Sequence, residues 1–465
     1  MRLPLFFYFV FIVQFAVAQT SDFVVVDSIT VKGNRQTRKK TILRELDFTV
    51  NDTIPVEDFG KRLSANELRL MNTNLFASAR INITRWDTEN KHATVEVIVK
   101  ESWYIYPYPI FELADRNFNV WWVQQNHDWR RINFGVRLYY QNPAGLGDLV
   151  KLTAQYGYTQ KYEAEYNLPY INKKQTLGLS VNTFFTKNKE IGYTTRQNIL
   201  AFRTIGNEEL IRRQRYWLQL NYRPRLRNYH FARLEHHQNR IAEEVVMLNP
   251  DFFLNGSTQQ RFLAAHYQYF YDNRDIKFYP INGSFFTLLV RKEGILPKDE
   301  INTLSIASMW GKYFPFTKRL SAEIITQGKV SLLRNKIPYF NYRALGFNET
   351  NLRGYEYYIV DGLDYGILKT SLRYAVLARN FNLGKYMALE SFKQLPVKMF
   401  LTLNNDLGYV NDPFNYEHNS FSNRLLWGGG VGLDIILYYS IVFQIEYSMN
   451  HLREKAVYLH YKVNF

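Results

Sequence analysis

From about residue 104 to its last residue, the sequence alternates between apolar and polar side chains. The segment 440–450, "SIVFQIEYSMN", places Ile441, Phe443 and Ile445 on one face and Gln444 and Glu446 on the other. A period of two residues is typical of a β-strand, and the two faces of such a strand need different surroundings. A transmembrane β-barrel provides lipid for the apolar face and a polar lumen for the other, whereas a soluble sandwich covers the apolar face with a second sheet.

The N-terminus distinguishes between these two folds. Residues 1–18, "MRLPLFFYFVFIVQFAVA", combine Arg2 with an apolar core and with Ala16 and Ala18, which predicts a signal peptide cleaved after residue 18. An uncleaved anchor helix is the alternative, but the apolar run is shorter than the roughly 20 residues that a membrane-spanning helix needs. No later stretch contains 18 or more apolar residues. An integral membrane protein with this sequence therefore has to cross as a closed barrel.

Aromatic content and chain length complete the fold prediction. The chain contains 35 Tyr, 34 Phe and 8 Trp, and aromatic residues form girdles at both interfaces of membrane barrels. Residues 104–465 number 362, which at roughly 10 residues per strand and about 12 per connection gives about sixteen strands. We therefore predict a mainly β protein with a transmembrane antiparallel barrel of about 16 strands over residues 103–465.

Charge and missing residue types limit the chemistry. A net charge of +16 is compatible with nucleic acid, acidic lipid headgroups or a cationic pore, and the predicted secretion leads us to expect no nucleic-acid partner. The chain has no Cys, which excludes a disulfide, a Cys-ligated metal and a lipidated N-terminal Cys. His236 and His237 are adjacent and point to opposite faces of a strand, and no catalytic or phosphate-binding motif occurs. We expect no enzyme, no metal and no cofactor.

A different pattern occupies residues 21–102. The strand-like segment "SITVKG" begins at Ser28, helical segments follow over 37–46 and 56–76, and two alternating runs occupy 77–86 and 92–101. The predicted apolar side of the second helix consists of Phe59, Leu63, Leu68, Leu70 and Leu75. These elements predict an α+β domain in which a helix pair covers a three-stranded sheet. An open edge of that sheet can accept another strand.

Four motifs carry a resemblance to a known family. They are "QNPAGLGDLVKL" (141–152), "YDNRDIKFYPINGSFF" (271–286), "NLRGYEYY" (351–358) and "FLTLNNDLGYV" (400–410). In this order, behind the small domain, they make the chain similar to the BamA/TamA superfamily of outer-membrane assembly and transport barrels. The small domain resembles the polypeptide-transport-associated (POTRA) module of that superfamily. The resemblance covers nearly all of the mature chain and implies an outer-membrane location, with the N-terminal domain in the periplasm.

The chain also departs from the family pattern. It has room for one POTRA module only, whereas central assembly barrels carry several, so its equivalence to the essential insertase does not follow. The segment "GGGVGLDIILYYSIVF" (428–443) lacks the Pro and Gly common in the corresponding turn. Strand ends near Tyr438 and Tyr439 are therefore not fixed by the sequence.

The resemblance implies a role for one arginine. In the family, the loop that contains Arg353, Gly354 and Tyr355 folds into the barrel lumen, and its arginine meets an acidic residue that matches Asp406, two residues before Gly408. A guanidinium offers several fixed donors to a carboxylate, so one pair can hold a long loop. The alternatives are that residues 405–408 form a plain turn and that Arg353 is a solvated loop charge.

Two further family features are implied. The motif 271–286 corresponds to a family turn made by Asp272, Arg274, Asp275, Pro280 and Gly283. We interpret this acidic pair as structural, the alternative being a catalytic acid pair. The aromatic C-terminal residue, Phe465, corresponds to an assembly signal.

The predicted function is assistance with the assembly, insertion or translocation of other outer-membrane or surface polypeptides. Pro107 and Pro109 lie in the predicted first strand, "WYIYPYPIFEL" (103–113), and cannot donate ladder hydrogen bonds. They indicate a weak seam between the first and last strands, or they mark a plain edge next to the module. Expected partners are unfolded client polypeptides, outer-membrane lipid and accessory periplasmic or lipoprotein subunits. A dedicated secretion channel for one partner and a passive porin are the alternatives.

Overall fold

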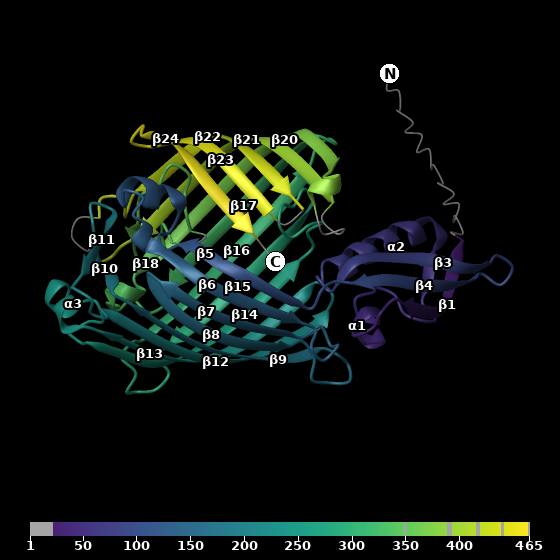
Figure 1. Cartoon of the computed structure of the whole chain (residues 1–465), viewed down its shortest axis with the longest axis horizontal. Coiled ribbons are helices and arrows are strands. Elements are labelled where there is room, and N and C mark those ends of the chain that lie inside the picture. The colour runs from purple at the N-terminus through teal and green to yellow at the C-terminus, as the bar shows by residue number, and fades with distance from the viewer. Residues whose placement is uncertain (1–21, 348–349, 388–392, 415–418, 439–440, 464–465) are drawn as a thin grey trace, which may run out of the picture.

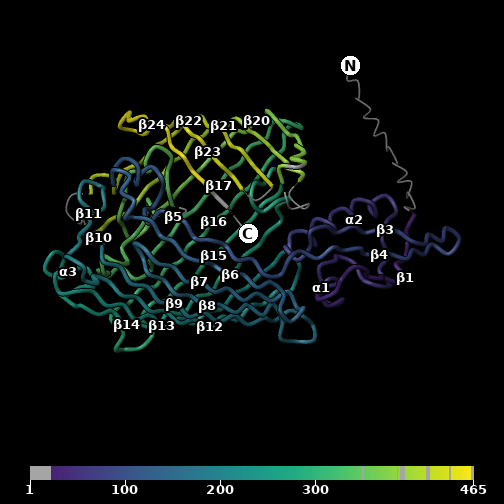
Figure 2. The backbone as a smooth tube through the Cα atoms, viewed as in Figure 1, coloured from purple at the N-terminus to yellow at the C-terminus, as the bar shows by residue number. Residues whose placement is uncertain are grey.

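The computed structural model describes residues 22–347, 350–387, 393–414, 419–438 and 441–463. The predicted signal peptide, residues 1–18, and the predicted assembly signal, Phe465, lie outside the described residues. The chain forms a small N-terminal domain beside one end of a much larger curved sheet (Figures 1 and 2).

The small domain follows the predicted order with one addition. Its elements are β1 (Phe23–Lys32), α1 (Lys39–Leu43), β2 (Thr53–Pro55), α2 (Val56–Met71), β3 (Phe76–Asp87) and β4 (His92–Glu101). The sheet order is β2-β1-β4-β3, with β1 parallel to β4 and the other pairs antiparallel. The prediction of three strands is wrong, because the short β2 pairs with the start of β1. Three residues are too few to produce a recognisable alternating pattern.

An apolar core holds this domain together. Helix α2 contributes Phe59, Leu63 and Leu70, which pack against the buried side of the sheet, including Val95 and Val97. Leu68, predicted to share the apolar side of the helix, is instead 53% exposed. At 100° per residue it lies well off the line that joins positions 59, 63 and 70.

The large sheet has sixteen antiparallel strands, as predicted. They are β5 (Ile105–Leu113), β6 (Ile132–Gln141), β7 (Leu149–Gly157), β8 (Thr159–Leu168), β9 (Leu177–Asn188), β12 (Ile211–Arg225), β13 (Asn228–Ile241), β14 (Gln259–Asp272), β15 (Gly283–Glu293), β16 (Thr303–Pro315), β17 (Leu320–Ser331), β20 (Asp364–Asn382), β21 (Gln394–Asn411), β22 (Leu425–Leu437), β23 (Ile441–Asn450) and β24 (Lys455–Val463). Each strand pairs with its neighbours in chain order, and the sheet curves into a barrel (Figure 1).

Loops at the barrel end far from the small domain carry the remaining elements. These are the π-helical turn η1 (Val120–Gln124), η2 (Trp129–Arg131), the hairpin of β10 (Glu190–Arg196) and β11 (Ile199–Thr204), α3 (Glu243–Leu248), η3 (Tyr339–Asn341), β18 (Arg343–Leu345) and β19 (Val360–Asp361). The short η4 (Gly384–Tyr386) lies at the opposite end. Within the described ranges, no helix is long and apolar enough to cross a membrane.

The two faces of the barrel wall differ as the alternation predicts. Along β23, Phe443, Ile445 and Tyr447 are exposed on the outer face, whereas Glu446 and Ser448 are buried on the inner face. The soluble-sandwich alternative is wrong, because no second sheet covers the outer face in the part of the chain that the structure describes. The barrel therefore has an apolar outside and a polar lumen.

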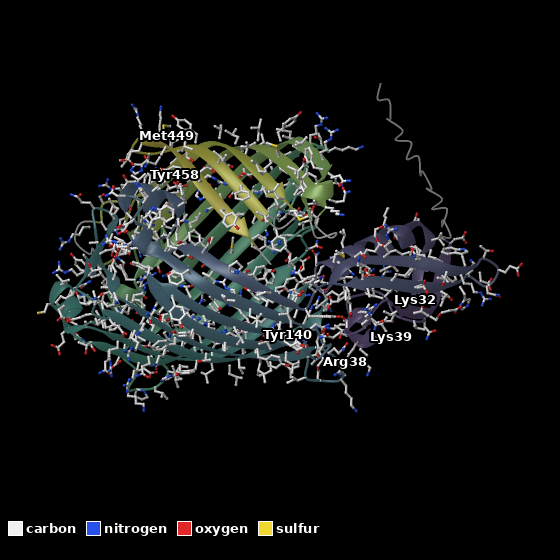
Figure 3. All side chains as sticks on the ribbon, in the orientation of Figure 1. Lys32, Arg38, Lys39, Tyr140, Met449 and Tyr458 are labelled. Atoms are coloured by element: carbon white, nitrogen blue, oxygen red, sulfur yellow. The ribbon has the colours of Figure 1, made fainter. Side chains whose placement is uncertain are left out.

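Polar contacts join the small domain to the barrel. The Arg38 side chain, labelled in Figure 3 at the junction, donates from Nε to the Ala144 carbonyl at 3.1 Å. The Thr41 hydroxyl donates to the Gly145 carbonyl at 3.1 Å. Arg223, at the end of β12, donates to both carboxylate oxygens of Glu45, which follows α1, at 2.6 and 3.0 Å. These contacts fix the domain against the turns at this end of the barrel.

Candidate functional site in the barrel lumen

The connection between β17 and β20, described over residues 332–347 and 350–363, folds in part into the barrel. Strands β18 and β19 pair antiparallel within it, and residues 350–363, hereafter the lumen loop, follow an inward path. Leu352 and Tyr355 of this loop are buried in an apolar cluster with Val410 on β21 and Leu426 on β22. The loop is thus packed against the inner wall of strands that are distant in sequence.

Arg353 is bonded to three strands of that wall. Its Nη1 lies 2.6 Å from Asp406 Oδ1 on β21, and its Nε lies 3.0 Å from Glu446 Oε2 on β23. Its Nη2 donates to the Ser371 hydroxyl on β20 at 3.2 Å, and its backbone N–H donates to Asp406 Oδ2 at 3.1 Å. Asp406 is 0% exposed and lies within β21, so the plain-turn alternative for residues 405–408 is wrong. The alternative of a solvated arginine is wrong as well, because its side chain is largely buried.

Glycines make room for the loop. Gly354 has φ +79°, and a Cβ there would lie 3.0 Å from the backbone of Asn450. A Cβ on Gly428 would lie 1.8 Å from the Arg353 carbonyl oxygen, and a Cβ on Gly408 would lie 2.3 Å from Leu352 Cδ1. Side chains at these positions would therefore displace the loop from the wall.

Tyr355 fixes the loop to β22 and to the residue that follows β23. Its hydroxyl donates to the Trp427 carbonyl at 3.0 Å and also bonds His451 Nδ1. Its ring meets the Phe421 ring edge-on at 5.7 Å. All three predicted loop residues therefore contact the wall. Arg353 does so through its guanidinium, Gly354 through its carbonyl, which accepts from Asn450 Nδ2 at 3.0 Å, and Tyr355 through its hydroxyl.

The predicted family turn enters the lumen from the opposite end. Residues 273–282 connect β14 to β15, and Tyr279 points inward, donating from its hydroxyl to Asp434 Oδ2 on β22 at 2.7 Å. The Pro280 carbonyl accepts a hydrogen bond from Arg373 Nη1 on β20 at 2.9 Å. The motif is therefore an inward-folded plug segment and not only a surface turn.

The charged residues of this motif hold the turn itself. Asp272 accepts two hydrogen bonds from the Arg274 side chain, both at 2.8 Å, and the Asp275 carboxylate accepts from the Ile281 backbone N–H at 3.1 Å. Gly283 has φ +104°, and a Cβ there would lie 2.1 Å from the Asn273 carbonyl oxygen. Asp272 and Asp275 thus bind groups of their own turn, which agrees with a structural interpretation of the pair.

The two inward segments reach the same strand. Ser371 on β20 bonds Arg353 of the lumen loop, and Arg373, two residues further, bonds Pro280 of the turn. Arg373 also pairs with Glu323 on β17. Because side chains two apart share one face of a strand, the inner face of β20 connects the plug of one barrel end with the loop of the other.

Several of these residues were not predicted from the sequence. Glu446 had been placed on the polar face of its strand, so the alternation offered a signal for it as a second partner of Arg353. Ser371, Arg373 and Glu323 stand in strands with no motif. Their pairing depends on the register between β17 and β20, which local sequence does not specify.

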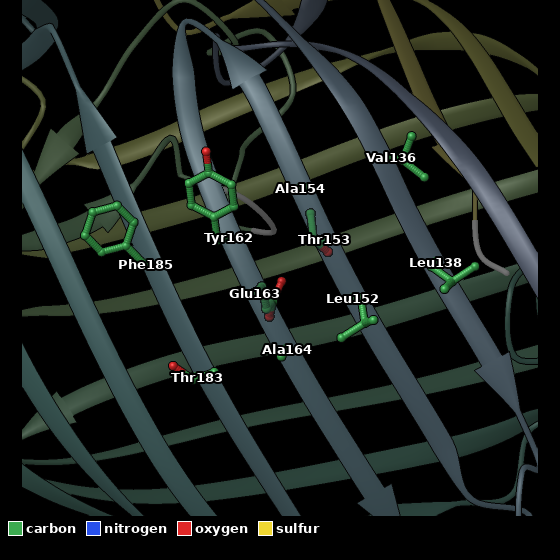
Figure 4. A pocket seen from close by; sticks show the side chains of 10 residues that line it. All are labelled: Val136, Leu138, Leu152, Thr153, Ala154, Tyr162, Glu163, Ala164, Thr183 and Phe185. Carbon is green, nitrogen blue, oxygen red and sulfur yellow. The ribbon is translucent and has the colours of Figure 1, made fainter.

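Two cavities lie apart from these contacts. One, of about 580 Å³, lies between the small domain and the barrel, and charged residues that include Glu45, Arg223 and Arg274 line it. A depression of about 430 Å³ lies in the wall formed by β6 to β9 (Figure 4). Most of its lining is apolar, including Leu152, Tyr162 and Phe185, and its polar members are Thr153, Thr183 and Glu163. The described residues also contain no group of three or more His, Asp or Glu arranged to hold a metal. The lumen does contain charge pairs that join chain segments, including Arg353–Asp406 and Arg373–Glu323.

Two family models match the sequence. The model described as "Surface antigen variable number repeat", a POTRA model, matches residues 24–102, and the model described as "Omp85 superfamily domain" matches residues 142–373. The chain has a POTRA domain and an Omp85 domain. Among curated proteins, none matches the sequence.

Solved structures share the fold of this Omp85 protein at low sequence identity. BamA from Haemophilus ducreyi lacking POTRA domains 1–3 aligns with a TM-score of 0.52 and 12% identity, over 95% of this chain and 84% of that one. CdiB from Escherichia coli aligns with a TM-score of 0.52 and 10% identity, over 97% and 92%. CdiB from Acinetobacter baumannii aligns with a TM-score of 0.51 and 10% identity, over 95% and 74%.

The two domains give the orientation of the protein. The Omp85 barrel lies in the bacterial outer membrane, and its POTRA domain lies in the periplasm. The turns next to the POTRA domain are therefore periplasmic, and the loops at the far end, from which the lumen loop enters, are extracellular. Omp85 proteins such as BamA are transport and assembly proteins.

Proposed function

We propose that this Omp85 protein assists the assembly, insertion or translocation of other outer-membrane or surface polypeptides. The observation that carries the proposal is the gap between the two end strands of the sheet, β5 and β24, hereafter the seam. Within the described residues, no strand ladder joins β5 to β24. An unpaired strand edge is a template for another strand, so a client segment has a place to pair on its way into lipid or through the wall.

The prolines of β5 support this role for the seam. The Gln141 N–H donates to the Tyr104 carbonyl at 2.6 Å, and the Ala114 N–H donates to the Arg131 carbonyl at 2.8 Å. Even-numbered residues near β5 therefore direct their backbone groups to β6, and odd-numbered ones direct them to the seam. Pro107 and Pro109 are odd-numbered, so the seam lacks two N–H donors that a continuous ladder needs.

The filled lumen argues against a passive porin. The lumen loop and the turn 273–282 both enter the barrel and bind the wall through charged or polar groups. A passive porin keeps a water-filled channel through its lumen. A dedicated secretion channel for one partner has the same architecture, so it remains the second candidate, and the experiment below separates it from a general assembly factor.

The POTRA domain provides the first contact in this proposal. Its outer strand, β3, has one free edge, and there the Ile81 N–H donates to Glu67 Oε1 of α2 at 2.8 Å. An extended client that pairs with the rest of this edge lies next to the barrel mouth. Accessory periplasmic or lipoprotein subunits are further proposed partners. We propose residues 21–102 as the extent of this domain, 103–465 as that of the barrel, and cleavage after residue 18.

Depletion followed by quantitative outer-membrane proteomics tests the function. Loss of several outer-membrane or surface proteins is expected, and rescue by the wild-type chain should restore them. Rescue by a variant that lacks residues 21–100 behind the signal peptide should fail, although that variant still inserts. Loss of a single surface protein would instead identify a dedicated secretion channel. An unchanged proteome would contradict both functions.

A further inference from the structure

A side chain of the chain itself occupies the free edge of the last strand. Asn119 lies in the connection between β5 and β6, residues 114–131, hereafter the seam loop. Its Oδ1 accepts a hydrogen bond from the Leu459 backbone N–H at 3.1 Å, and its Nδ2 donates to the Leu459 carbonyl at 3.4 Å. A carboxamide offers the same acceptor and donor as a peptide group. Asn119 thus makes with Leu459 both bonds that a residue of a neighbouring strand would make.

The position of Leu459 in β24 makes this contact relevant to the seam. The Asn450 N–H donates to the Glu454 carbonyl at 3.2 Å, so even-numbered residues near this end of β24 face β23. Odd-numbered residues, including Val457, Leu459 and Tyr461, therefore present their backbone groups to the seam. Asn119 covers the middle of these three.

Local structure leaves the side chain of Asn119 available for the contact with β24. Asn119 precedes η1 with helical backbone angles, φ −67° and ψ −39°, and its side chain makes no capping bond. The Val120 N–H is instead accepted by Asn117 Oδ1 at 2.9 Å. Asn119 is 4% exposed, so its amide is committed to β24 in a dry environment.

The seam loop is also tied to the lumen loop. Arg116 Nη1 donates to the Tyr358 carbonyl at 3.0 Å, and its Nη2 donates to the Tyr357 carbonyl at 3.1 Å. Asn117 Nδ2 donates to the Glu356 carbonyl at 2.8 Å. Three consecutive carbonyls of the lumen loop therefore hold the seam loop, and through it Asn119, in place.

We propose that Asn119 is a surrogate strand residue that guards the edge of β24, so that a client strand pairs there only after displacing it. The competition rests on the proposed function, whereas the occupancy of the edge does not. Because the seam loop is hydrogen-bonded to the lumen loop, release of the lumen loop moves Asn119 away from β24. Asn119 therefore controls access to the edge of β24, and the ligand that it excludes is an extended polypeptide segment.

Amide hydrogen exchange on the intact chain in lipid nanodiscs tests the occupancy. In the wild-type protein, the Leu459 amide should exchange about tenfold more slowly than those of Val457 and Tyr461, as expected for one hydrogen bond at an otherwise open edge. Asn119→Ala and the similarly sized Asn119→Leu should remove this difference. Gln125→Ala, in the same loop and without a side-chain hydrogen bond in the structure, is the matched control and should preserve it. Equal exchange of the three amides in the wild type would overturn the proposal without any variant.

Peptide binding tests the competition. The probe is a labelled peptide of residues 455–465, a strand with the alternation of this barrel, added to the intact protein in nanodiscs. Asn119→Ala should bind it about tenfold more tightly than wild type and Gln125→Ala, as measured by fluorescence anisotropy. Equal affinity would overturn the guarding role. Neither measurement depends on client insertion in cells, so a failure of the proteomics experiment and a failure here have separate meanings.

Discussion

The interior of the POTRA domain and the interior of the barrel are stabilised by different physical effects. The POTRA interior is a cluster of apolar side chains around α2 and the sheet, including Phe59 and Leu70. The barrel interior contains buried charges, among them Arg353, Asp406 and Glu446, joined across strands. The first interior is held by removal of apolar surface from water, and the second by directed bonds between charged groups.

This difference separates the interactions that stabilise a whole domain from those that hold a single loop in position. A truncated apolar side chain leaves a cavity and weakens the whole domain. A truncated charged side chain leaves an unpaired partner and weakens one contact, while the ladder of the barrel wall is untouched. The following predictions test this separation, from the largest expected effect to the smallest.

Leu70→Ala should have the largest effect. Leu70 is fully buried in the POTRA core, and Leu→Ala changes at such positions destabilise by about 2–5 kcal/mol. Proteolysis of the intact chain in increasing urea should show earlier cleavage within residues 22–101, with the barrel unaffected. Leu68→Ala, at an exposed position of the same helix, is the control. Equal shifts for the two variants would contradict an apolar core as the main support.

Arg353→Ala should have an intermediate effect confined to the lumen loop. The change leaves Asp406 and Glu446 without their shared cation, and loss of hydrogen bonds to charged groups costs about 1.5–3 kcal/mol. Exchange of loop amides should rise, while heat resistance of the barrel on gels should stay near wild type. Arg353→Lys should rescue only part of the loss, because an ammonium lacks the fixed fork of a guanidinium.

The partners of Arg353 should not be equivalent to it. Asp406→Ala leaves Arg353 with Glu446, so its effect on loop exchange should be smaller than that of Arg353→Ala. Adding Asp406→Ala to Arg353→Ala should cause less than the sum of the two losses, since one unpaired carboxylate is then removed. Additive losses in this double-mutant cycle would show that the two residues act independently.

Glu45→Gln should loosen the junction between the domains by a smaller amount. It keeps the size of the side chain but removes the charge that Arg223 binds with two hydrogen bonds. We expect a weakening of about 1 kcal/mol, visible as faster cleavage of the 102–104 connection by a protease added on the periplasmic side. Cleavage at the wild-type rate would mean that the contacts of Arg38 and Thr41 suffice.

The pH dependence of the same junction should be the smallest effect. Burial raises the pKa of the Glu101 carboxyl, but hydrogen bonds from Thr37, Tyr104 and the Gln36 backbone outweigh it and lower the pKa from 4.5 to about 2. The folded form thus prefers the charged carboxylate. The stabilisation is complete above pH 4.5 and is lost as the pH falls toward 2. A pH series of junction cleavage should show this loss, and Glu101→Gln should abolish the dependence in that window.

Sequence reasoning found the elements whose signals are local. The alternation of residues 440–450 specifies a strand with one polar and one apolar face. The motifs at 351–358 and 400–410 identify two segments that lie in contact. Leu68 was misplaced because a leucine between two core leucines on a helix looks apolar in sequence, whereas its angle around the axis points it to solvent. A shift of one or two positions along a helix is enough to turn a side chain from the core to solvent.

Contacts between segments that are distant in sequence could not be predicted from local sequence patterns. Nothing in "DRNFNVWW" (115–122) distinguishes Asn119, which binds Leu459, from Asn117, which binds Glu356. Both choices follow from where the seam loop lies over the sheet edge. In the same way, Arg373 finds Glu323 only because β17 and β20 become neighbours across an intervening loop of more than thirty residues.

The alternation of the barrel wall places inward-facing side chains at regular intervals along each strand. On β21 three successive inner positions are Thr402, Asn404 and Asp406, and successive inner positions of a strand are about 7 Å apart. Only one of the three carries a negative charge, so a small slide along β21 takes the Arg353 guanidinium from its carboxylate to neutral groups. A shifted lumen loop therefore loses Asp406 and keeps at most Glu446 of its two carboxylate partners. The full set of bonds thus exists at one position along β21, the position at which Arg353 reaches Asp406 and Glu446 together.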